Sequence, residues 1–247
     1  MELGRVCAIA VMAKAPRPGH VKTRLQTILA PAEAAALGAA FLEDVTANIQ
    51  AAAGQAPIHG YVAYAPAGQE AHFDTLLAPG TKLVLADGAD GDADGVEGFG
   101  RCLLHATRAL LSRGYGAACL LNADSPTLPT ALLAQAAQRL LAPGRRAVLG
   151  PADDGGYWLL GMQTAEPALY ARIPWSTDAV ANTTAQRATE AGLPLERLNT
   201  WFDVDDQPSL QRLMRGLAAP PPGTFPAPAT RACVEALRLV DRLPAAA

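Results

Sequence analysis

The chain has 247 residues, of which 50% are hydrophobic, and a formal net charge of −3. It is long enough to bury a substantial core in one large domain. Its slightly acidic balance excludes a general basic field that would attract nucleic acid or an anionic membrane surface, so any anion binding must be local. We therefore expect no nucleic-acid partner and no membrane association.

The four cysteines are far apart and form no C-x-x-C pair, so the sequence contains neither a zinc knuckle nor a dithiol redox motif; they are Cys7, Cys102, Cys119 and Cys233. Sparse cysteines are typical of a reducing compartment, and we predict a cytoplasmic protein. No apolar run approaches the roughly 20 residues of a membrane-spanning helix.

The first predicted element is a buried strand over residues 6–13 (VCAIAVMA), a short apolar run that ends at a Pro/Gly loop. With Arg5 before it and Ala13-Lys14-Ala15 after it, the run imitates a signal peptide. It is at the short limit for such a signal and leads straight into a charged loop, so the strand is the better interpretation.

The rest of the chain alternates between helices and strands. We expect helices over 21–29 and 31–53, strands over 58–64 and 82–86 around a helix near 70–77, a helix over 101–114, a strand over 117–122, a helix over 129–141, strands over 147–151 and 157–162, and helices over 178–191 and 207–216. This order predicts an α/β fold, a three-layer α/β/α sandwich with a mostly parallel sheet. Ligands of such sheets bind beyond the carboxyl ends of the strands.

Residues 1–217 are predicted to form this single domain. The segment 218–229 is too rich in proline to be core and has the composition of a stiff connector. Residues 231–243 fit either a short helix that docks onto the domain or a loosely held tail. We therefore treat 218–247 as a separate C-terminal segment.

The loop after the first strand concentrates positive charge. It holds two of the three lysines of the chain, and its candidate phosphate-binding residues are Lys14, Arg17, Gly19, Lys22 and Arg24. A P-loop would need a glycine directly before the lysine, and a dinucleotide site would need G-x-G-x-x-G after a strand, and neither is present. Cations gathered at a predicted helix start favour a bound phosphate. The alternative is a solvated cationic turn.

Carboxylates follow later strands. Asp124 comes just after the predicted strand 117–122 and could hold Mg²⁺ or Mn²⁺ against a phosphate, although an Asx turn would also explain it. Asp203 and Asp205 alternate, so they share a face of an extended segment. Asp205 or Asp206 could instead cap the last helix.

The stretch 150–161 (GPADDGGYWLLG) has the composition of a tight hairpin, and it places Asp153, Asp154 and Gly155 at the edge of the expected cleft. There a carboxylate could hold an acceptor hydroxyl or act as the base. Trp175 offers an apolar wall, and Ser176 or Thr177 is expected to cap the following helix.

The acidic loop 87–98 imitates a calcium-binding EF-hand but has Arg101 where that motif needs a glutamate. We interpret it as a solvated loop or lid.

Five motifs in order resemble a bacterial family of glycosyltransferases in the nucleotide-diphospho-sugar transferase superfamily, some of them assigned to arsenosugar biosynthesis. The family segment K-A-P-x-P-G-x-x-K-T-R-L matches residues 14–25. The others are D-x-P-x-L at 124–128, D-G-G-Y at 154–157, W-S-T at 175–177 and D-V-D at 203–205. The resemblance covers roughly 6–216, and this sequence departs from it at Asn122, Ser125 and 99–102.

The resemblance implies the GT-A fold and a divalent ion, Mg²⁺ or Mn²⁺, between nucleotide phosphates and Asp124. Asp203 or Asp205 would assist that ion. The cationic loop would bind the nucleotide, and Asp154 with Trp175 would face the acceptor. Asp124, Asp154 and Lys22 are the predicted catalytic residues, while Asp153, Gly155 and Ser176 would line the acceptor side.

Three functions remain open from the sequence. The first, which the family resemblance favours and which we take as the leading hypothesis, is transfer of a sugar from a nucleotide-sugar to a small acceptor. The second is nucleotidyl transfer from a nucleoside triphosphate with release of pyrophosphate, because the loop is similar to the triphosphate-binding loops of molybdenum-cofactor and phospholactate guanylyltransferases. The third is a non-catalytic nucleotide sensor. The sequence gives no basis for choosing the base, the sugar, the acceptor or the oligomeric state.

Overall fold

The computed structural model describes residues 2–243 and is built around one seven-stranded sheet with the order β3-β2-β1-β4-β6-β5-β7. β1 (Cys7–Ala13) lies between β2 (Ile58–Tyr64) and β4 (Ala117–Leu121) and runs parallel to both. β6 is antiparallel to its two neighbours. The remaining strands are β3 (Lys82–Leu85), β5 (Ala147–Pro151), β6 (Tyr157–Met162) and β7 (Leu195–Arg197). The mostly parallel sheet is as predicted.

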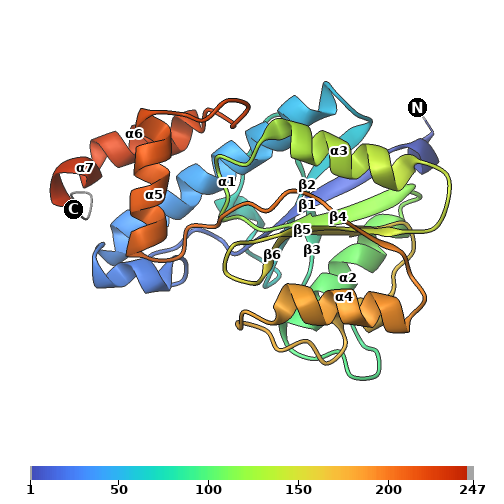
Figure 1. Cartoon of the computed structure of the whole chain (residues 1–247). Helices are drawn as coiled ribbons and strands as arrows, with labels where there is room; N and C mark the ends of the chain where they lie inside the picture. Colours follow the sequence, from blue (N-terminus) through green and yellow to red (C-terminus); the bar gives the residue numbers. More distant parts are fainter. Residues whose placement is uncertain (1, 244–247) are drawn as a thin grey trace.

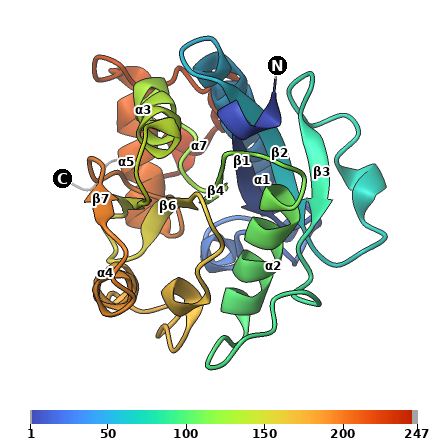
Figure 2. The same cartoon turned by 90° about the vertical axis from the view of Figure 1, so that its right-hand side faces the viewer.

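Helices cover both faces of the sheet, which explains why the strands are continuously apolar. α1 (Pro31–Ala53) and α3 (Thr130–Leu141) pack on one face, and α2 (Phe99–Leu111) and α4 (Val180–Glu190) pack on the other. Figures 1 and 2 show these layers on either side of the sheet. The three-layer α/β/α architecture is thereby confirmed.

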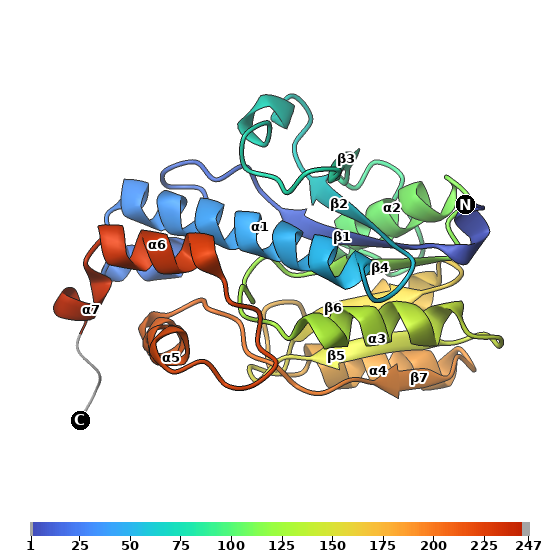
Figure 3. The ribbon, with the colours of Figure 1, turned by 90° about the horizontal axis from the view of Figure 1, so that it is seen from above.

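A third hydrophobic cluster lies beyond the sheet, on the amino-terminal half of α1. It is formed by α5 (Gln207–Ala218), α6 (Pro228–Ala236) and α7 (Leu239–Arg242) packed against Leu37 and Phe41 of α1. Figure 3 shows α6 lying along α1. The segment 231–243 therefore docks onto the domain. No helix among residues 2–243 is long and apolar enough to cross a bilayer.

Asp44 of α1 fastens α6 to the domain. Its buried carboxylate accepts the backbone N–H groups of Ala229 (3.1 Å) and Thr230 (2.6 Å), in the first turn of α6. Burial raises the pKa of Asp44, although both N–H groups favour the charged form. A carboxylate in this position also complements the positive end of the helix.

Two of the predicted helices are wrong. The segment 21–29 forms only a short 3₁₀ turn, Thr23–Thr27, because Lys22 takes a left-handed backbone conformation (φ 49°) that interrupts the helix. The segment 70–77 contains a 3₁₀ turn at Glu70–His72. There the Glu70 carboxylate accepts the hydroxyl of Tyr64 and the N–H of Gly68, which ties the turn to β2.

Two smaller predictions also differ from the structure. α4 begins at Val180 with Ala179 as its N-cap, so neither Ser176 nor Thr177 caps it; the Thr177 hydroxyl donates to the carbonyl of Pro174 (2.7 Å). The short edge strand β7 was not predicted, because its sequence Leu-Glu-Arg is mostly polar. By contrast, Asp206 caps α5 as expected, accepting the N–H of Ser209 (2.9 Å).

We predict that Asp44→Ala lowers the free energy of unfolding by about 1–2 kcal/mol, because two amide donors at the start of α6 lose their acceptor. Urea unfolding measures the change, and limited proteolysis should cut the chain near residues 219–230. The control is Glu43→Ala, which removes an exposed carboxylate one position away. Equal stability of the two variants would contradict a role for Asp44 in fastening α6.

Candidate functional site

A cavity of about 320 Å³ lies at the carboxyl end of β1, where the cationic loop meets the carboxylates. β1 and β4 are adjacent parallel strands, so the loops that follow them emerge at the same edge of the sheet. The loop after β1 contributes Lys14, Lys22 and Arg24, and the loop after β4 contributes Asp124. Asp205 reaches the cavity from the segment before α5. Segments far apart in the sequence thus converge, as expected.

Lys22 is the buried centre of this convergence. Its side chain is 6% exposed, and its ammonium lies 2.5 Å from an Asp124 oxygen and 3.5 Å from an Asp205 oxygen. It also donates a hydrogen bond to the carbonyl of Val204 (2.6 Å) and lies 4.8 Å from the ring centre of Phe41. An ammonium has three donors, and all three have acceptors here. Lys22 therefore positions the carboxylates in this structure, and its contact with a phosphate stays a prediction.

The two cations that remain accessible are Lys14 and Arg24. Lys14 is exposed, lines the cavity and has no ion-pair partner within the described residues. Arg24 is 65% exposed and is held near Asp205 by a contact of 3.5 Å. The other two predicted loop residues do not line the cavity: Arg17 donates to the side chain of Gln69 (3.0 Å), and Gly19 forms a turn with φ 81°. Lys14 and Arg24 are thus the cations of the predicted phosphate site that stay accessible.

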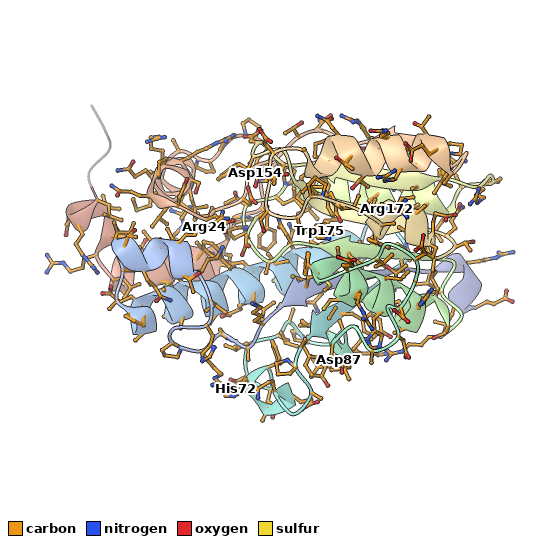
Figure 4. All side chains as sticks on the ribbon, turned by 90° about the horizontal axis from the view of Figure 1, so that it is seen from below. Arg24, His72, Asp87, Asp154, Arg172 and Trp175 are labelled. Atoms are coloured by element: carbon orange, nitrogen blue, oxygen red, sulfur yellow. The ribbon has the colours of Figure 1, made fainter. Side chains whose placement is uncertain are left out.

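A second cavity of about 460 Å³ adjoins the first and shares Arg24 and Asp205 with it. Its other lining residues are Phe99, Asn122, Asp154, Gly156, Tyr157, Trp175, Ser176, Thr177, Asp178, Val180 and Asp203. In Figure 4, Arg24, Asp154 and Trp175 are grouped around the middle of the molecule, while His72 and Asp87 lie apart. The predicted acceptor-side residues Asp154, Trp175 and Ser176 all line this cavity.

The hairpin between β5 and β6 positions Asp154. Gly155 at its tip has φ 88°, and a Cβ there would lie 2.1 Å from the carbonyl oxygen of Asp178, so only glycine fits. The Asp154 carboxylate accepts the N–H of Gly156 (2.8 Å), which turns it toward the second cavity. Asp153 turns away and pairs with Arg212 of α5 (2.5 Å). Of the two candidate bases, the geometry thus favours Asp154.

The carboxylates of the site repel one another. Burial raises the pKa of Asp203 to about 6, with further contributions from the charges of Asp154, Asp205 and Asp124. The pKa of Asp205 is raised mainly by burial and by Asp124, and is lowered by the nearby Lys22 and Arg24. Carboxylates held together in this way favour a compensating cation.

The carboxylates of the site supply some, but not all, of the ligands that a divalent cation needs. Hard oxygen ligands suit Mg²⁺ and Mn²⁺, which are often bound by one or two carboxylates together with substrate phosphates. Across residues 2–243, no three side chains of His, Cys, Asp or Glu lie close enough together to hold a metal ion by themselves. A metal held by Asp124, Asp203 and Asp205 therefore stays a prediction, and it would need ligands from a bound nucleotide.

The sequence profile of a family described as "Uncharacterized protein conserved in bacteria (DUF2064)" matches residues 48–177. The chain belongs to this family. No curated protein sequence matches it. The matched region of the DUF2064 protein contains Asp124, Asp154 and Trp175, whereas the cationic loop and the Asp203–Asp205 segment lie outside it.

Solved structures with the same fold extend over nearly the whole DUF2064 chain. A putative nucleotide-diphospho-sugar transferase from Desulfovibrio desulfuricans G20 is 27% identical, with a TM-score of 0.80 and 96% of each chain covered. A cytidylyltransferase from Leptospira borgpetersenii is 10% identical, with a TM-score of 0.53 and 98% of each chain covered. CMP:2-keto-3-deoxy-manno-octonic acid synthetase, complexed with CTP, is 12% identical, with a TM-score of 0.53 over 86% of this chain and 98% of its own. The fold is therefore that of nucleotide-diphospho-sugar transferases and nucleotidyltransferases.

Sequence reasoning missed several lining residues of the second cavity in this DUF2064 protein. Phe99 and Tyr157 contact Trp175 edge-on, with ring centres 5.5 Å and 6.5 Å away, and together they form an aromatic wall. Tyr157 lies in the D-G-G-Y motif, so its position was available as a signal. The sequence carried no such signal for Phe99 and Asp178. The helices near them were predicted to begin at residues 101 and 178, whereas α2 begins at Phe99 and α4 begins at Val180.

We predict that Lys22→Met lowers the free energy of unfolding by about 2 kcal/mol, because Asp124 and Asp205 lose their shared partner. This value lies between the typical contributions of exposed and of buried ion pairs to stability. For a chain of this size the melting temperature should fall by roughly 5 °C. Adding Asp124→Asn should recover part of the loss by removing one of the two repelling charges. The control, Lys14→Met, should melt like the unmodified protein. Equal melting of the Lys22 and Lys14 variants would contradict the positioning role.

Proposed function

We propose that this protein is a nucleotide-dependent transferase that moves a sugar from a nucleotide-sugar to a small acceptor. One observation carries the proposal: a cavity with accessible cations opens into a cavity walled by carboxylates and aromatic rings, and Arg24 and Asp205 lie where the two meet. A nucleoside diphosphate in the first cavity would place its sugar in the second. The Desulfovibrio relative, similar over 96% of each chain, bears a name that supports this class of substrate.

Each cavity supplies a different part of the reaction. Lys14 and Arg24 would bind the phosphates and stabilise the negative charge of the departing nucleoside diphosphate. Lys22 would keep Asp124 and Asp205 in place by its contacts of 2.5 Å and 3.5 Å. Asp154, held by the N–H of Gly156, would accept a proton from the acceptor hydroxyl.

A divalent ion, Mg²⁺ or Mn²⁺, would add Lewis-acid stabilisation of the phosphates when it is bound. Asp124 and Asp205 would hold it, with Asp203 nearby. The ion would also relieve the repulsion among these carboxylates.

The charge of the second cavity favours glycosyl over nucleotidyl transfer. Among residues 2–243, four carboxylates line it, and its one cation is the guanidinium of Arg24. The carboxylates are those of Asp154, Asp178, Asp203 and Asp205. A phosphorylated acceptor would be repelled there, whereas the hydroxyls of a sugar can donate to carboxylates and its apolar face can rest on aromatic rings. The arsenosugar-biosynthesis subtype that the resemblance implies stays a prediction.

The reaction products distinguish the three candidate functions. The protein is incubated with Mg²⁺ or Mn²⁺, a panel of nucleotide-sugars and nucleoside triphosphates, and polyol acceptors, and the released species are identified by mass spectrometry. We expect a nucleoside diphosphate, formed only when nucleotide-sugar and acceptor are both present. Release of pyrophosphate from a triphosphate would establish the nucleotidyl alternative. Binding without any turnover would favour the non-catalytic sensor.

A second test addresses the metal. Asp124→Ala should abolish metal-dependent nucleotide binding, measured by calorimetry with a nucleoside diphosphate with and without Mg²⁺. The melting temperature of the protein without nucleotide should fall by less than the roughly 5 °C expected for Lys22→Met, because Asp205 and the carbonyl of Val204 still accept from the ammonium and Asp205 loses a repelling neighbour. A fall as large as that of Lys22→Met would instead identify Asp124 as a structural turn residue.

A further inference from the structure

A separate cavity of about 410 Å³ lies between α5 and the proline-rich connector, and we call it the connector cavity. Its volume is within the range of small-molecule sites. Its walls come from Thr127, residues 201–202, four residues of α5 between 212 and 217, residues 219–221 and 224–226, and Arg231 of α6. Within the described chain, it shares no lining residue with the two cavities of the candidate site.

Aromatic rings form the apolar part of the connector cavity. The rings of Trp201 and Phe202 lie 5.5 Å apart at 34°, and Phe225 joins them from the connector. The guanidinium of Arg212 stacks over Phe202 at 4.0 Å. Aromatic and apolar groups bind well against such surfaces.

The charge of the connector cavity is positive and only partly compensated. Of the residues that the structure describes, three arginines and no aspartate or glutamate line it. Arg212 is paired with Asp153 at 2.5 Å, whereas Arg215 and Arg231 have no ion-pair or hydrogen-bond partner for their guanidinium groups among residues 2–243. In a protein whose net charge is −3, two free guanidinium groups beside an apolar cavity form a local binding surface for an anion.

The connector cavity is preorganised. The connector is attached to the body of the protein by the N–H of Phe225, which donates to the carbonyl of Thr127 (3.3 Å), and the Thr224 hydroxyl donates to the carbonyl of Pro221 (2.8 Å). Prolines 220, 221 and 226 restrict the backbone of its wall. Walls that need no ordering on binding leave more of the interaction energy for affinity.

We propose that the connector cavity is a second ligand site, which binds a small organic anion with an aromatic or aliphatic body. The apolar body would pack on Trp201, Phe202 and Phe225. Its carboxylate or phosphate would bind the guanidinium groups of Arg215 and Arg231. This site is distinct from the nucleotide-dependent reaction proposed above and does not depend on it.

Calorimetry with three naphthalene probes tests the proposal and separates the two anion chemistries. The probes are 2-naphthoate, 2-naphthyl phosphate and the neutral 2-naphthamide. We expect at least one of the two anions to bind at one site with a Kd at or below about 1 mM, as for a fragment of this size. The neutral amide should bind at least about tenfold more weakly. The tighter anion identifies whether a carboxylate or a phosphate is preferred.

Variants locate the binding. Arg215→Gln/Arg231→Gln should weaken the anion at least about tenfold, whereas the control pair Arg5→Gln/Arg238→Gln, outside the cavity, should leave the affinity unchanged. Gly216→Leu provides a second route. A Cβ at this position meets no atom of residues 2–243 within 4 Å beyond its own helix backbone and chain neighbours, so we expect α5 to keep its fold while the side chain fills the cavity and blocks binding. Lys14→Gln should leave binding intact, which excludes the phosphate loop as the site.

Three outcomes would overturn the second ligand site. The first is that neither anion binds at 5 mM, a concentration about five times the expected upper limit for Kd. The second is that the amide binds as tightly as the anions. The third is that Gly216→Leu and the arginine double variant, each shown to be folded by its melting curve, bind the anion as well as the unmodified protein.

Discussion

The buried ammonium of Lys22 is the constraint on which the candidate site depends. A charged group that is 6% exposed is costly unless it is paired, and Lys22 finds its partners in Asp124, Asp205 and the carbonyl of Val204. These contacts bind together three segments that follow β1, follow β4 and precede α5. The left-handed backbone of Lys22, at a cost of about 1–3 kcal/mol, directs the side chain inward.

The same constraint decides which charges are free to act on a ligand. Because its ammonium contacts Asp124, Asp205 and the carbonyl of Val204, Lys22 holds the site together. Lys14 and Arg24, at the exposed positions of the loop, stay accessible to a ligand. The carboxylates on the other side have one buried cation among them, so burial and mutual repulsion raise the pKa of Asp203 and of Asp205. The site thus has an inner layer that fixes geometry and an outer layer that can respond to a bound nucleotide.

The sequence predicted the sheet and the convergence of charges because both follow from local patterns. Continuous apolar runs mark strands covered on both faces, and polar residues at the ends of parallel strands must meet at one edge. It could not predict what long-range contacts decide: that Asp153 turns to Arg212, that Arg17 turns to Gln69, or that Asp44 caps a helix about 185 residues later. The left-handed Lys22 is of the same kind, because its conformation is stabilised by partners distant in the chain.

The cluster of helices α5 to α7 belongs to the site as well, although it holds none of the reacting groups. Leu25 and Leu29, which follow the cationic loop, are buried in the same hydrophobic cluster as Val204 and Leu210, which flank Asp205. Apolar packing therefore holds the cationic loop and the acidic segment against each other from behind, while Lys22 joins them in front. Because α1 extends past the sheet to carry this cluster, the packing of α5 to α7 supports both flanks of the site. The helices beyond the sheet thus help to hold the two segments together around one cavity.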